Sequence, residues 1–169
     1  MRVVGIDPGL SGAVACARVN PATGEVIGVE VHDLPVTDFV DGRRVPDPVG
    51  LYDLLRVLQP DLVVLEHVEA RPGRGSVSSW RFAQGFGATL AACQLATDGP
   101  RVHLVRPSLW KAALGLSSDK SASLAAARSA FPGVADRLAR VKDDGRAEAL
   151  LLIQYYRTVL LPSGQMEVI

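Results

Sequence analysis

The chain has 169 residues, of which 48% are hydrophobic and 21% charged, and its 18 basic and 18 acidic residues give zero net charge. This length suits one compact domain, so we expect a single domain over residues 1–169. We find no apolar run long enough to cross a bilayer and no signal peptide, and we therefore expect a cytoplasmic protein without a membrane partner. The zero charge neither favours nor excludes nucleic acid as a partner. Cys16 and Cys93 lie among apolar neighbours, which predicts buried free thiols.

The first third of the chain predicts three strands and a helix. Apolar runs over 2–7, 13–19 and 25–33 are separated by turns rich in Pro and Gly, the pattern of an antiparallel meander. Residues 34–47 carry prolines and charges and predict a loop. Apolar residues at helical spacing predict a helix over 48–58.

The remaining residues alternate between strands and helices. A continuously apolar run over 61–66 is typical of a strand buried on both faces, and 101–105 predicts a fifth strand. A loop is expected over 69–78, and helices over 79–97, 107–114, 119–130 and 144–160. Three antiparallel strands followed by two parallel strands predict an α/β fold, a mixed five-stranded sheet with helices on both faces.

Carboxylates follow two of the predicted strands and open the last predicted helix. Asp7 ends the first strand and Glu66 the fourth, and Asp143, Asp144 and Glu148 begin the helix. Asp144 and Glu148 are four residues apart and share a helix face, whereas Asp143 points away from Glu148. Like charges gathered in one place repel unless a hard divalent cation lies among them. The sequence therefore predicts a metal centre at these residues, with Asp143 and Asp144 as alternatives for one position.

Such a centre has a chemical purpose, although each residue also has a simpler interpretation. Two divalent ions about 4 Å apart can clamp a phosphodiester, activating water on one side and stabilising the leaving oxygen on the other. Taken alone, Asp7 could be a turn residue, Glu66 a solvated charge, and the two aspartates helix caps. Their joint placement at strand ends, where sheets of this kind place their sites, favours the metal centre.

Four motifs, in order along nearly the whole chain, resemble the RuvC-type Holliday junction resolvases of the phage and prophage branch. They are Gly5-Ile6-Asp7-Pro8-Gly9 with Ser11-Gly12, Leu65-Glu66 with Arg71-Pro72-Gly73-Arg74-Gly75, Pro107-Ser108-Leu109-Trp110-Lys111 with Asp119-Lys120, and Asp143-Asp144-Gly145-Arg146-Ala147-Glu148. The resemblance implies a ribonuclease H-like fold, a homodimer, Mg²⁺ or Mn²⁺ as two ions per site, and paired nicks across a four-way DNA junction.

The resemblance also implies roles for individual residues. Metal binding falls to Asp7, Glu66, Asp144 and Glu148, and Lys111 joins them as a catalytic residue. The chain departs from the family in the last helix, where many bacterial resolvases have two aspartates three residues apart. Here the residue three before Glu148 is Gly145, so the choice between Asp143 and Asp144 stays open.

The segment after Glu66 predicts a DNA-binding loop. Its guanidinium groups can hold phosphates bidentately, and its glycines and serines let backbone amides approach phosphate. Trp80 and Phe82 either stack on bases or cover the core as the first turn of a helix. Lys111 and Lys120 either contact phosphates or are solvated surface residues, and the resemblance favours the former. The predicted DNA-binding residues are Arg71, Arg74, Ser78, Trp80, Arg81, Lys111 and Lys120.

Three other functions compete with the prediction of a junction-resolving endonuclease in DNA recombination or repair. Asp-x-Gly after a strand also opens the phosphate loop of sugar kinases and actin-like ATPases. Those folds need a second lobe, for which the chain has too few residues, so we expect no nucleotide cofactor. A related nuclease that cuts other branched DNA or RNA, and a non-catalytic junction-binding module, stay open as alternatives. The helix over 79–97 offers small and apolar residues that suit either the core or a dimer interface.

Overall fold

The computed structural model describes residues 1–67, 75–97, 101–117, 119–164 and 166–169, and the side chain of Lys120 also lies outside the description. The strands are β1 (Arg2–Asp7), β2 (Ala13–Val19), β3 (Val26–Asp33), β4 (Val36–Asp38), β5 (Arg44–Pro46), β6 (Leu62–Glu66) and β7 (Val102–Val105). The α-helices are α1 (Pro48–Leu58), α2 (Ser76–Ala96), α3 (Pro107–Ala113), α4 (Lys120–Ala130), α5 (Asp144–Tyr155) and α6 (Leu161–Ser163). Two 3-10 segments, η1 (Pro132–Leu138) and η2 (Val141–Asp143), and a π-helical turn, η3 (Tyr156–Leu160), complete the set.

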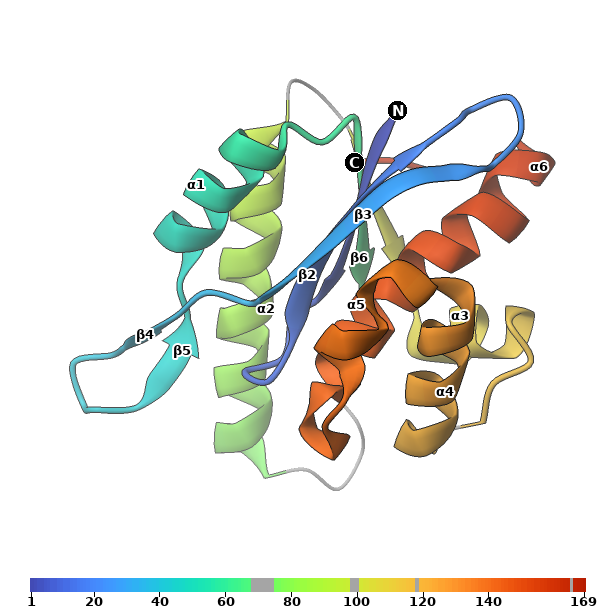
Figure 1. The fold of residues 1–169 in the computed structure, drawn as a ribbon. Coiled ribbons are helices and arrows are strands. Elements are labelled where there is room, and N and C mark those ends of the chain that lie inside the picture. Colours follow the sequence, from blue (N-terminus) through green and yellow to red (C-terminus); the bar gives the residue numbers. More distant parts are fainter. Residues whose placement is uncertain (68–74, 98–100, 118, 165) are drawn as a thin grey trace.

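The main sheet has five strands in the order β3-β2-β1-β6-β7. β1 pairs antiparallel with β2, which pairs antiparallel with β3, whereas β6 and β7 run parallel to β1. Helices α1 and α2 cover one face, and α5, with α3 and α4 beside it, covers the other (Figure 1). The predicted mixed α/β sheet with helices on both faces is confirmed.

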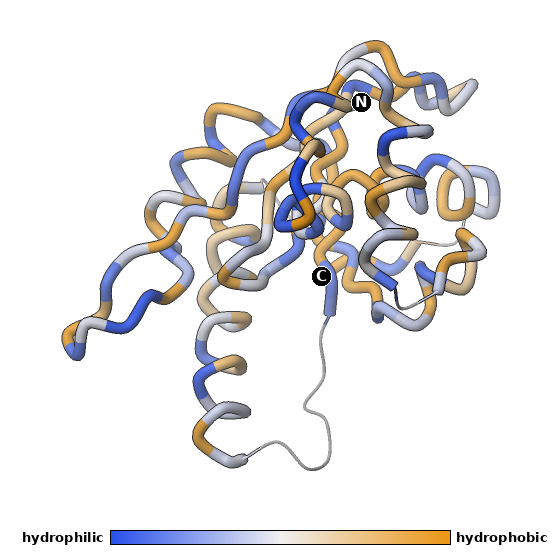
Figure 2. Tube along the Cα trace, turned by 60° about the horizontal axis from the view of Figure 1, so that its bottom comes forward, coloured by the Kyte–Doolittle hydropathy of each residue, from blue (hydrophilic) through white to orange (hydrophobic). Residues whose placement is uncertain are grey.

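The central strands are buried because each face of the sheet has its own apolar layer. Successive residues of a strand point to opposite faces, so Val3 packs on the α5 side and Val4 on the α1 and α2 side, both fully buried. Hydrophobic positions gather where helices meet the sheet, and hydrophilic positions follow the outer turns (Figure 2). Cys16 and Cys93 are buried free thiols in these layers, as predicted.

The prediction of a loop over 34–47 is wrong in part, because this segment contains a hairpin. β4 and β5 pair antiparallel, with Val36 opposite Pro46. The turn closes through the Phe39 amide, which donates to the Arg43 carbonyl, and through Gly42, whose φ of 75° lies in the region that favours glycine. Each strand has only three residues, too few for an alternating pattern to stand out.

Two helix boundaries differ from the prediction. α2 begins at Ser76 rather than at residue 79, and most of the predicted loop over 69–78 lies outside the described residues. The last predicted helix, over 144–160, is divided into α5 and the π turn η3, and the short helix α6 follows beyond its predicted end. Pro162 explains the division, since a proline donates no hydrogen bond and its ring crowds the carbonyl four residues earlier.

Two glycines allow α5 to pack directly on the sheet. A Cβ at Gly5 of β1 would lie 2.1 Å from the Ala149 carbonyl oxygen of α5. A Cβ at Gly145 of α5 would lie 2.2 Å from the Ser11 carbonyl oxygen in the β1–β2 turn. Both positions exclude larger residues, so the first turn of α5 lies against the end of β1. No helix among the described residues is long and apolar enough to cross a membrane.

Candidate active site

The strand register brings Asp7 and Glu66 to the same edge of the sheet. β1 and β6 are parallel neighbours, with Ile6 opposite Leu65, so the next residue of each strand is a carboxylate at the carboxyl end. The close packing of Gly145 then sets the start of α5 beside them. The predicted convergence of two strand ends and one helix start is what the fold produces.

Asp7 lies in a setting that opposes its negative charge. Its Oδ1 accepts a hydrogen bond from the Gly9 amide at 3.0 Å. Desolvation by burial, with smaller contributions from the Glu148 and Asp144 charges, raises its pKa to about 6, although the Gly9 amide and Lys111 act in the opposite direction. The interactions with Glu148 and Asp144 place both residues within electrostatic reach of Asp7.

Glu66 is enclosed more completely, with 5% of its surface exposed. Its Oε1 accepts a hydrogen bond from the indole Nε1 of the fully buried Trp110, at 3.0 Å. Burial raises the pKa of Glu66 to about 7, and the charges of Asp7 and Glu148 add to the rise. Trp110 and Lys111 partly offset it. Trp110 belongs to a quoted motif, but no role was predicted for it, because its contact with Glu66 joins residues 44 positions apart.

Lys111 supplies positive charge to this carboxylate group. Its Nζ donates to Glu148 Oε1 at 2.7 Å, and both side chains are largely buried. The ammonium group also lies 5.1 Å from the centre of the Trp110 ring. The structure therefore brings Lys111 together with the predicted carboxylates, as expected for a residue of the site. Its electrostatic effects on Asp7 and Glu66 both favour the charged carboxylate.

The two adjacent aspartates point in different directions. Asp143 is 3% exposed and accepts hydrogen bonds from Arg140, including Nη2 to Oδ1 at 2.6 Å and the backbone amide to Oδ2 at 2.8 Å. Arg146 lies 3.7 Å from the same carboxylate. The Arg140 hydrogen bonds hold the pKa of Asp143 below its usual range. Asp144 instead acts on Asp7, so this geometry favours Asp144 and argues against Asp143 as a ligand.

A further ion pair fixes the start of α5. Arg146 donates from Nε to Asp33 Oδ1 at 2.7 Å and from Nη2 to Asp33 Oδ2 at 2.8 Å. This bidentate pair joins α5 to the end of β3, 113 residues earlier in the chain. Arg140 and Arg146 were not predicted to have these structural roles, since both depend on which carboxylate the fold brings near.

The donor set fits a hard cation, although the side chains are not gathered around one point. Within the described ranges, no group of three or more His, Cys, Asp or Glu side chains is placed to hold a metal ion. Asp7, Glu66 and Glu148 nevertheless repel one another, and a cationic group, Lys111, lies among them. Carboxylate oxygens of this kind are the preferred ligands of Mg²⁺ and Mn²⁺.

The histidines do not join this site. His67 follows Glu66 in sequence, but its ring lies 5.3 Å from that of Phe86 in α2. The Nδ1 atom of His103 lies 2.7 Å from the Glu167 carbonyl oxygen. Both rings therefore have structural partners outside the carboxylate site.

Of the predicted DNA-binding residues, three lie at the exposed start of α2. Ser78 and Arg81 are exposed, and Trp80 is 63% exposed, so the interpretation of Trp80 as a cover for the core is wrong. Phe82 is half-buried and lines a pocket with Ser78 and Arg81. Arg71 and Arg74 lie outside the described residues, as does the side chain of Lys120.

Comparisons with known proteins point in one direction. No family model matches the chain. The structure aligns with *Thermus thermophilus* RuvC in complex with a Holliday junction substrate at a TM-score of 0.65, with 18% identity over the whole of both chains. The chain has the RuvC fold. A second *T. thermophilus* RuvC structure aligns over the whole of both chains at a TM-score of 0.58, with 19% identity. The RuvC fold confirms the predicted fold class.

Two further relatives are also named as resolvases. The structure also aligns with that of the yeast mitochondrial Holliday junction resolvase Ydc2 at a TM-score of 0.51. The alignment covers 92% of this chain and 78% of Ydc2, with 16% identity. The chloroplastic Holliday junction resolvase MOC1 of *Chlamydomonas reinhardtii* is 34% identical over 119 residues, which are 69% of this chain. The match spans only 12% of the length of MOC1.

Proposed function

We propose that the chain is a metal-dependent endonuclease that resolves four-way DNA junctions by paired phosphodiester hydrolysis. The observation that carries this proposal is that Asp7 lies within electrostatic reach of three other carboxylates at one edge of a RuvC fold, those of Glu66, Asp144 and Glu148. The likeness to MOC1 and to a RuvC structure containing a junction supports four-way DNA as the substrate. Because the match covers a small part of MOC1, the proposal of a four-way junction as the substrate depends on the carboxylate site as well as on this likeness.

The proposed cofactor is Mg²⁺, with Mn²⁺ as a substitute and two ions per site. Asp7, Glu66, Asp144 and Glu148 would hold the ions, with Glu148 exchanging its contact with Lys111 for the metal. When bound, such ions activate water and stabilise the leaving oxygen. Repulsion between the buried carboxylates supports this assignment, since a divalent cation removes it.

Two residues of the chain have supporting roles in the proposed reaction. Lys111, once released from Glu148, is close enough to the carboxylates to stabilise negative charge that develops on the phosphate. Trp110 holds Glu66 in one orientation through its indole hydrogen bond, which limits the positions that the carboxylate can adopt. The fixed geometry suits in-line attack, which depends on orientation.

Two of the proposed DNA contacts, Ser78 and Arg81, line a pocket with Pro8 and Gly9, which directly follow Asp7. Ser78, Trp80 and Arg81 are exposed on the first turns of α2, and Arg71 and Arg74 precede them in the sequence. Exposed arginine and tryptophan side chains suit phosphate binding and base stacking. Contacts from Arg71, Arg74 and Lys120 stay predictions, because these side chains lie outside the described residues.

A homodimer would explain paired nicks, because a four-way junction has an approximate two-fold axis. Helix α2 supports the proposal. Phe86 and Leu90 pack against the core, whereas Val77 is 59% and Leu95 73% exposed. The helix therefore contributes to the core and also presents apolar residues on its outer side. A cytoplasmic location and the phage or prophage branch stay predictions.

The substrate is tested by incubating purified protein with a labelled four-way junction, a duplex of matched sequence and an RNA–DNA hybrid. Each substrate is tested with Mg²⁺, with Mn²⁺ and with a chelator, and Asp7→Asn is the matched variant. We expect paired nicks in the junction that require metal and are absent in the variant. Cleavage of the RNA–DNA hybrid alone would mean that the protein has the proposed metal site but does not cut four-way junctions. Binding of the junction by folded protein, without cleavage in either metal, would favour the non-catalytic module.

A further inference from the structure

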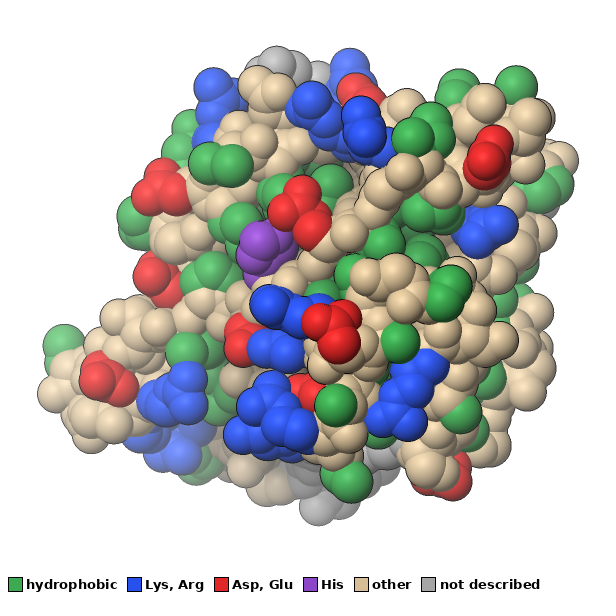
Figure 3. Space-filling model, viewed as in Figure 1, with side chains coloured by type: hydrophobic (Ala, Val, Ile, Leu, Met, Phe, Trp, Pro, Cys, Tyr) green, Lys and Arg blue, Asp and Glu red, His purple; other side chains and the backbone are tan. Residues whose placement is uncertain are grey.

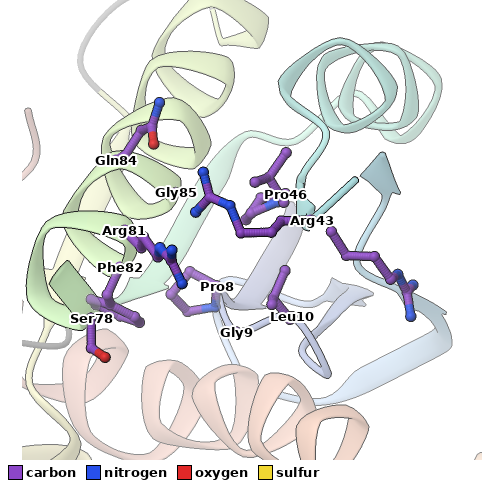
Figure 4. A pocket seen from close by; sticks show the side chains of 12 residues that line it. Pro8, Gly9, Leu10, Arg43, Pro46, Ser78, Arg81, Phe82, Gln84 and Gly85 are labelled. Atoms are coloured by element: carbon purple, nitrogen blue, oxygen red, sulfur yellow. The ribbon is translucent and has the colours of Figure 1, made fainter. Parts of the chain in front are cut away.

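A pocket of about 460 Å³ adjoins the carboxylate site and is absent from the sequence prediction. It lies between the β4–β5 hairpin, the β1–β2 turn and α2, as Figure 4 shows. Pro8 and Gly9, which directly follow Asp7, form part of its wall. Whatever occupies the pocket therefore lies next to the residue at the centre of the proposed active site.

The inner surface of the pocket is mainly apolar. Leu10 from the turn, Pro46 from the hairpin and Phe82 from α2 face one another across it (Figure 4). Leu10 is 53% exposed, and Phe82 is half-buried without being part of the packed core clusters. The walls are held together, because a Cβ at Gly85 would lie 3.2 Å from the Pro46 ring. The pocket thus offers an apolar surface between two fixed walls.

The rim of the pocket is basic, and no acidic side chain is among the described residues that line it. Arg43 is engaged within the hairpin, where it pairs with Asp41 and lies 5.8 Å from the centre of the Phe39 ring. Alternation along β5 puts Arg44 on the same side as Pro46, which faces α2. Arg81 approaches from α2 itself. The basic side chains over the hairpin are visible in Figure 3.

We propose that this pocket binds one nucleotide of the DNA strand that enters the carboxylate site. The base would lie against Phe82 and Pro46, and its phosphate between Arg44 and Arg81. A flat apolar base joined to an anion matches an apolar pocket with an arginine rim, since aromatic side chains stack on bases and guanidinium groups bind phosphate. The inference rests on the proposed nuclease function, and it makes the hairpin and α2 the two walls that hold a nucleotide beside the cut.

The test scans the DNA with 2-aminopurine, a base whose fluorescence rises when it leaves the base stack. The probe is placed at each position around the branch point, and binding is measured with metal chelated so that cleavage plays no part. The proteins are the natural chain, Phe82→Ala, Arg44→Gln and, as a control, Arg56→Gln, which changes an exposed arginine of α1 outside the pocket. Melting temperatures are compared first, and Arg44→Gln decides the matter if Phe82→Ala is unfolded.

We expect fluorescence to rise several-fold at one position next to the nick, and the rise to be lost in Phe82→Ala and Arg44→Gln but kept in Arg56→Gln. Loss of the stacking partner should weaken binding roughly tenfold. Arg44→Gln should reduce the slope of log affinity against log salt by about one.

The outcomes separate this inference from the proposed function. Suppose that the junction is cleaved but that no probe position changes in fluorescence, or that all four proteins give the same change. This result would contradict nucleotide binding in the pocket and would leave the proposed nuclease function intact. A fluorescence change at one position, without cleavage in any metal, would contradict the proposed nuclease function and support nucleotide binding in the pocket. If pocket substitutions instead convert a dimer to a monomer in sedimentation, the pocket holds a second copy of the chain and the inference is wrong.

Discussion

The acidity of the site is set residue by residue through burial. Asp7 and Glu66 have raised pKa values chiefly because the fold removes water from them, and only secondarily because of neighbouring carboxylate charges, of which Glu148 acts on both. Trp110 and Lys111 counter this effect on Glu66 by donating a hydrogen bond and a nearby positive charge. A carboxylate that is costly to ionise without a partner gains most when a cation arrives, which is the physical basis of metal affinity here.

The indole of Trp110 provides the first prediction. Trp110→Phe keeps the apolar ring in the core but removes the Nε1 donor to Glu66. Loss of a hydrogen bond to a charged group costs about 1.5–3 kcal/mol. We expect single-turnover junction cleavage to fall by about tenfold or more, with junction affinity unchanged. The same substitution in a Glu66→Ala background, which lacks the acceptor, should have a much smaller effect on thermal unfolding, and equal effects in both backgrounds would contradict the role assigned to this bond.

The two neighbouring aspartates provide a matched pair of variants. Asp143→Asn weakens the hydrogen bonds that the nearly buried Asp143 accepts from the half-exposed Arg140, so we expect a loss of about 1–2 kcal/mol in the free energy of unfolding. Asp144→Asn should reduce that free energy by less than Asp143→Asn does, and it should reduce cleavage by about a hundredfold or more. Denaturant unfolding and single-turnover cleavage, measured on both proteins, check the pair. The opposite pattern would assign the ligand role to Asp143.

The sequence predicts the reactive carboxylates of the site more readily than the residues that hold them in place. Carboxylates at strand ends are visible in the sequence because strand ends are visible, which is how Asp7 and Glu66 were predicted. The sequence does not decide between Asp143 and Asp144 as the metal ligand, because the answer depends on which of them binds Arg140. Trp110 could be placed in a motif but not against Glu66, because nothing local links two residues on different elements.

At the scale of elements, the site depends on how closely α5 approaches β1. Gly5 and Gly145 permit contact distances that a Cβ would prevent. The Arg146–Asp33 pair holds the same end of α5 to β3. Glycine is unfavourable in a helix interior by about 1 kcal/mol relative to alanine, so its presence in the first turn of α5 suits a packing requirement. Gly145, where the sequence differs from the resolvase motif that it resembles, thus makes a close contact between α5 and the turn.

Gly145→Ala tests this account. The added methyl group would meet the Ser11 carbonyl at 2.2 Å, so α5 must move away from the turn and carry Asp144 and Glu148 with it. We expect a loss of about 1–3 kcal/mol in the free energy of unfolding and a larger proportional loss of cleavage. The control is Gly133→Ala, where nothing lies within 4 Å of the added Cβ. A Gly145→Ala protein that cuts junctions at the natural rate would show that the site does not depend on the close contact between α5 and the β1–β2 turn.

The elements themselves were largely predictable because most of them bury a continuous apolar run. β1, β2, β6 and α1 match their predicted ranges within a residue, since hydrophobic period and turn residues agree there. The β4–β5 hairpin was missed because its strands are short and lie apart from the main sheet. The π turn before Pro162 was missed because apolar periodicity continues across it. Local pattern therefore predicts core elements better than the hairpin that shapes the pocket.

At the scale of the whole molecule, the buried carboxylates make stability depend on pH. The folded pKa values of Asp7, about 6, and Glu66, about 7, lie above the ordinary values of 3.8 and 4.5. Between those limits the folded state binds more protons than the unfolded state, so the free energy of unfolding falls as pH rises. The lowered pKa of Asp143 acts at more acidic pH and does not cancel this slope.

With metal chelated, we expect the protein to lose on the order of 2–4 kcal/mol of stability between about pH 5 and pH 8. The slope should be largely absent in an Asp7→Asn, Glu66→Gln double variant. Mg²⁺ should raise the melting temperature more at the alkaline end, where its ligands are already deprotonated. Thermal unfolding of both proteins across this range measures the effect. A natural chain that becomes more stable as pH rises would contradict the assigned burial of these groups.

The most direct test of the central claim measures metal binding and junction cleavage on the same samples. Mn²⁺ is titrated by calorimetry into the natural chain and into Asp7→Asn, and nicking of a labelled four-way junction is followed at each metal concentration. We predict that the natural chain binds Mn²⁺ and that its nicking rises with occupancy, while the folded variant loses both. Junction nicking by the natural chain in chelator, or undiminished nicking by Asp7→Asn, would contradict a metal-dependent site at these carboxylates.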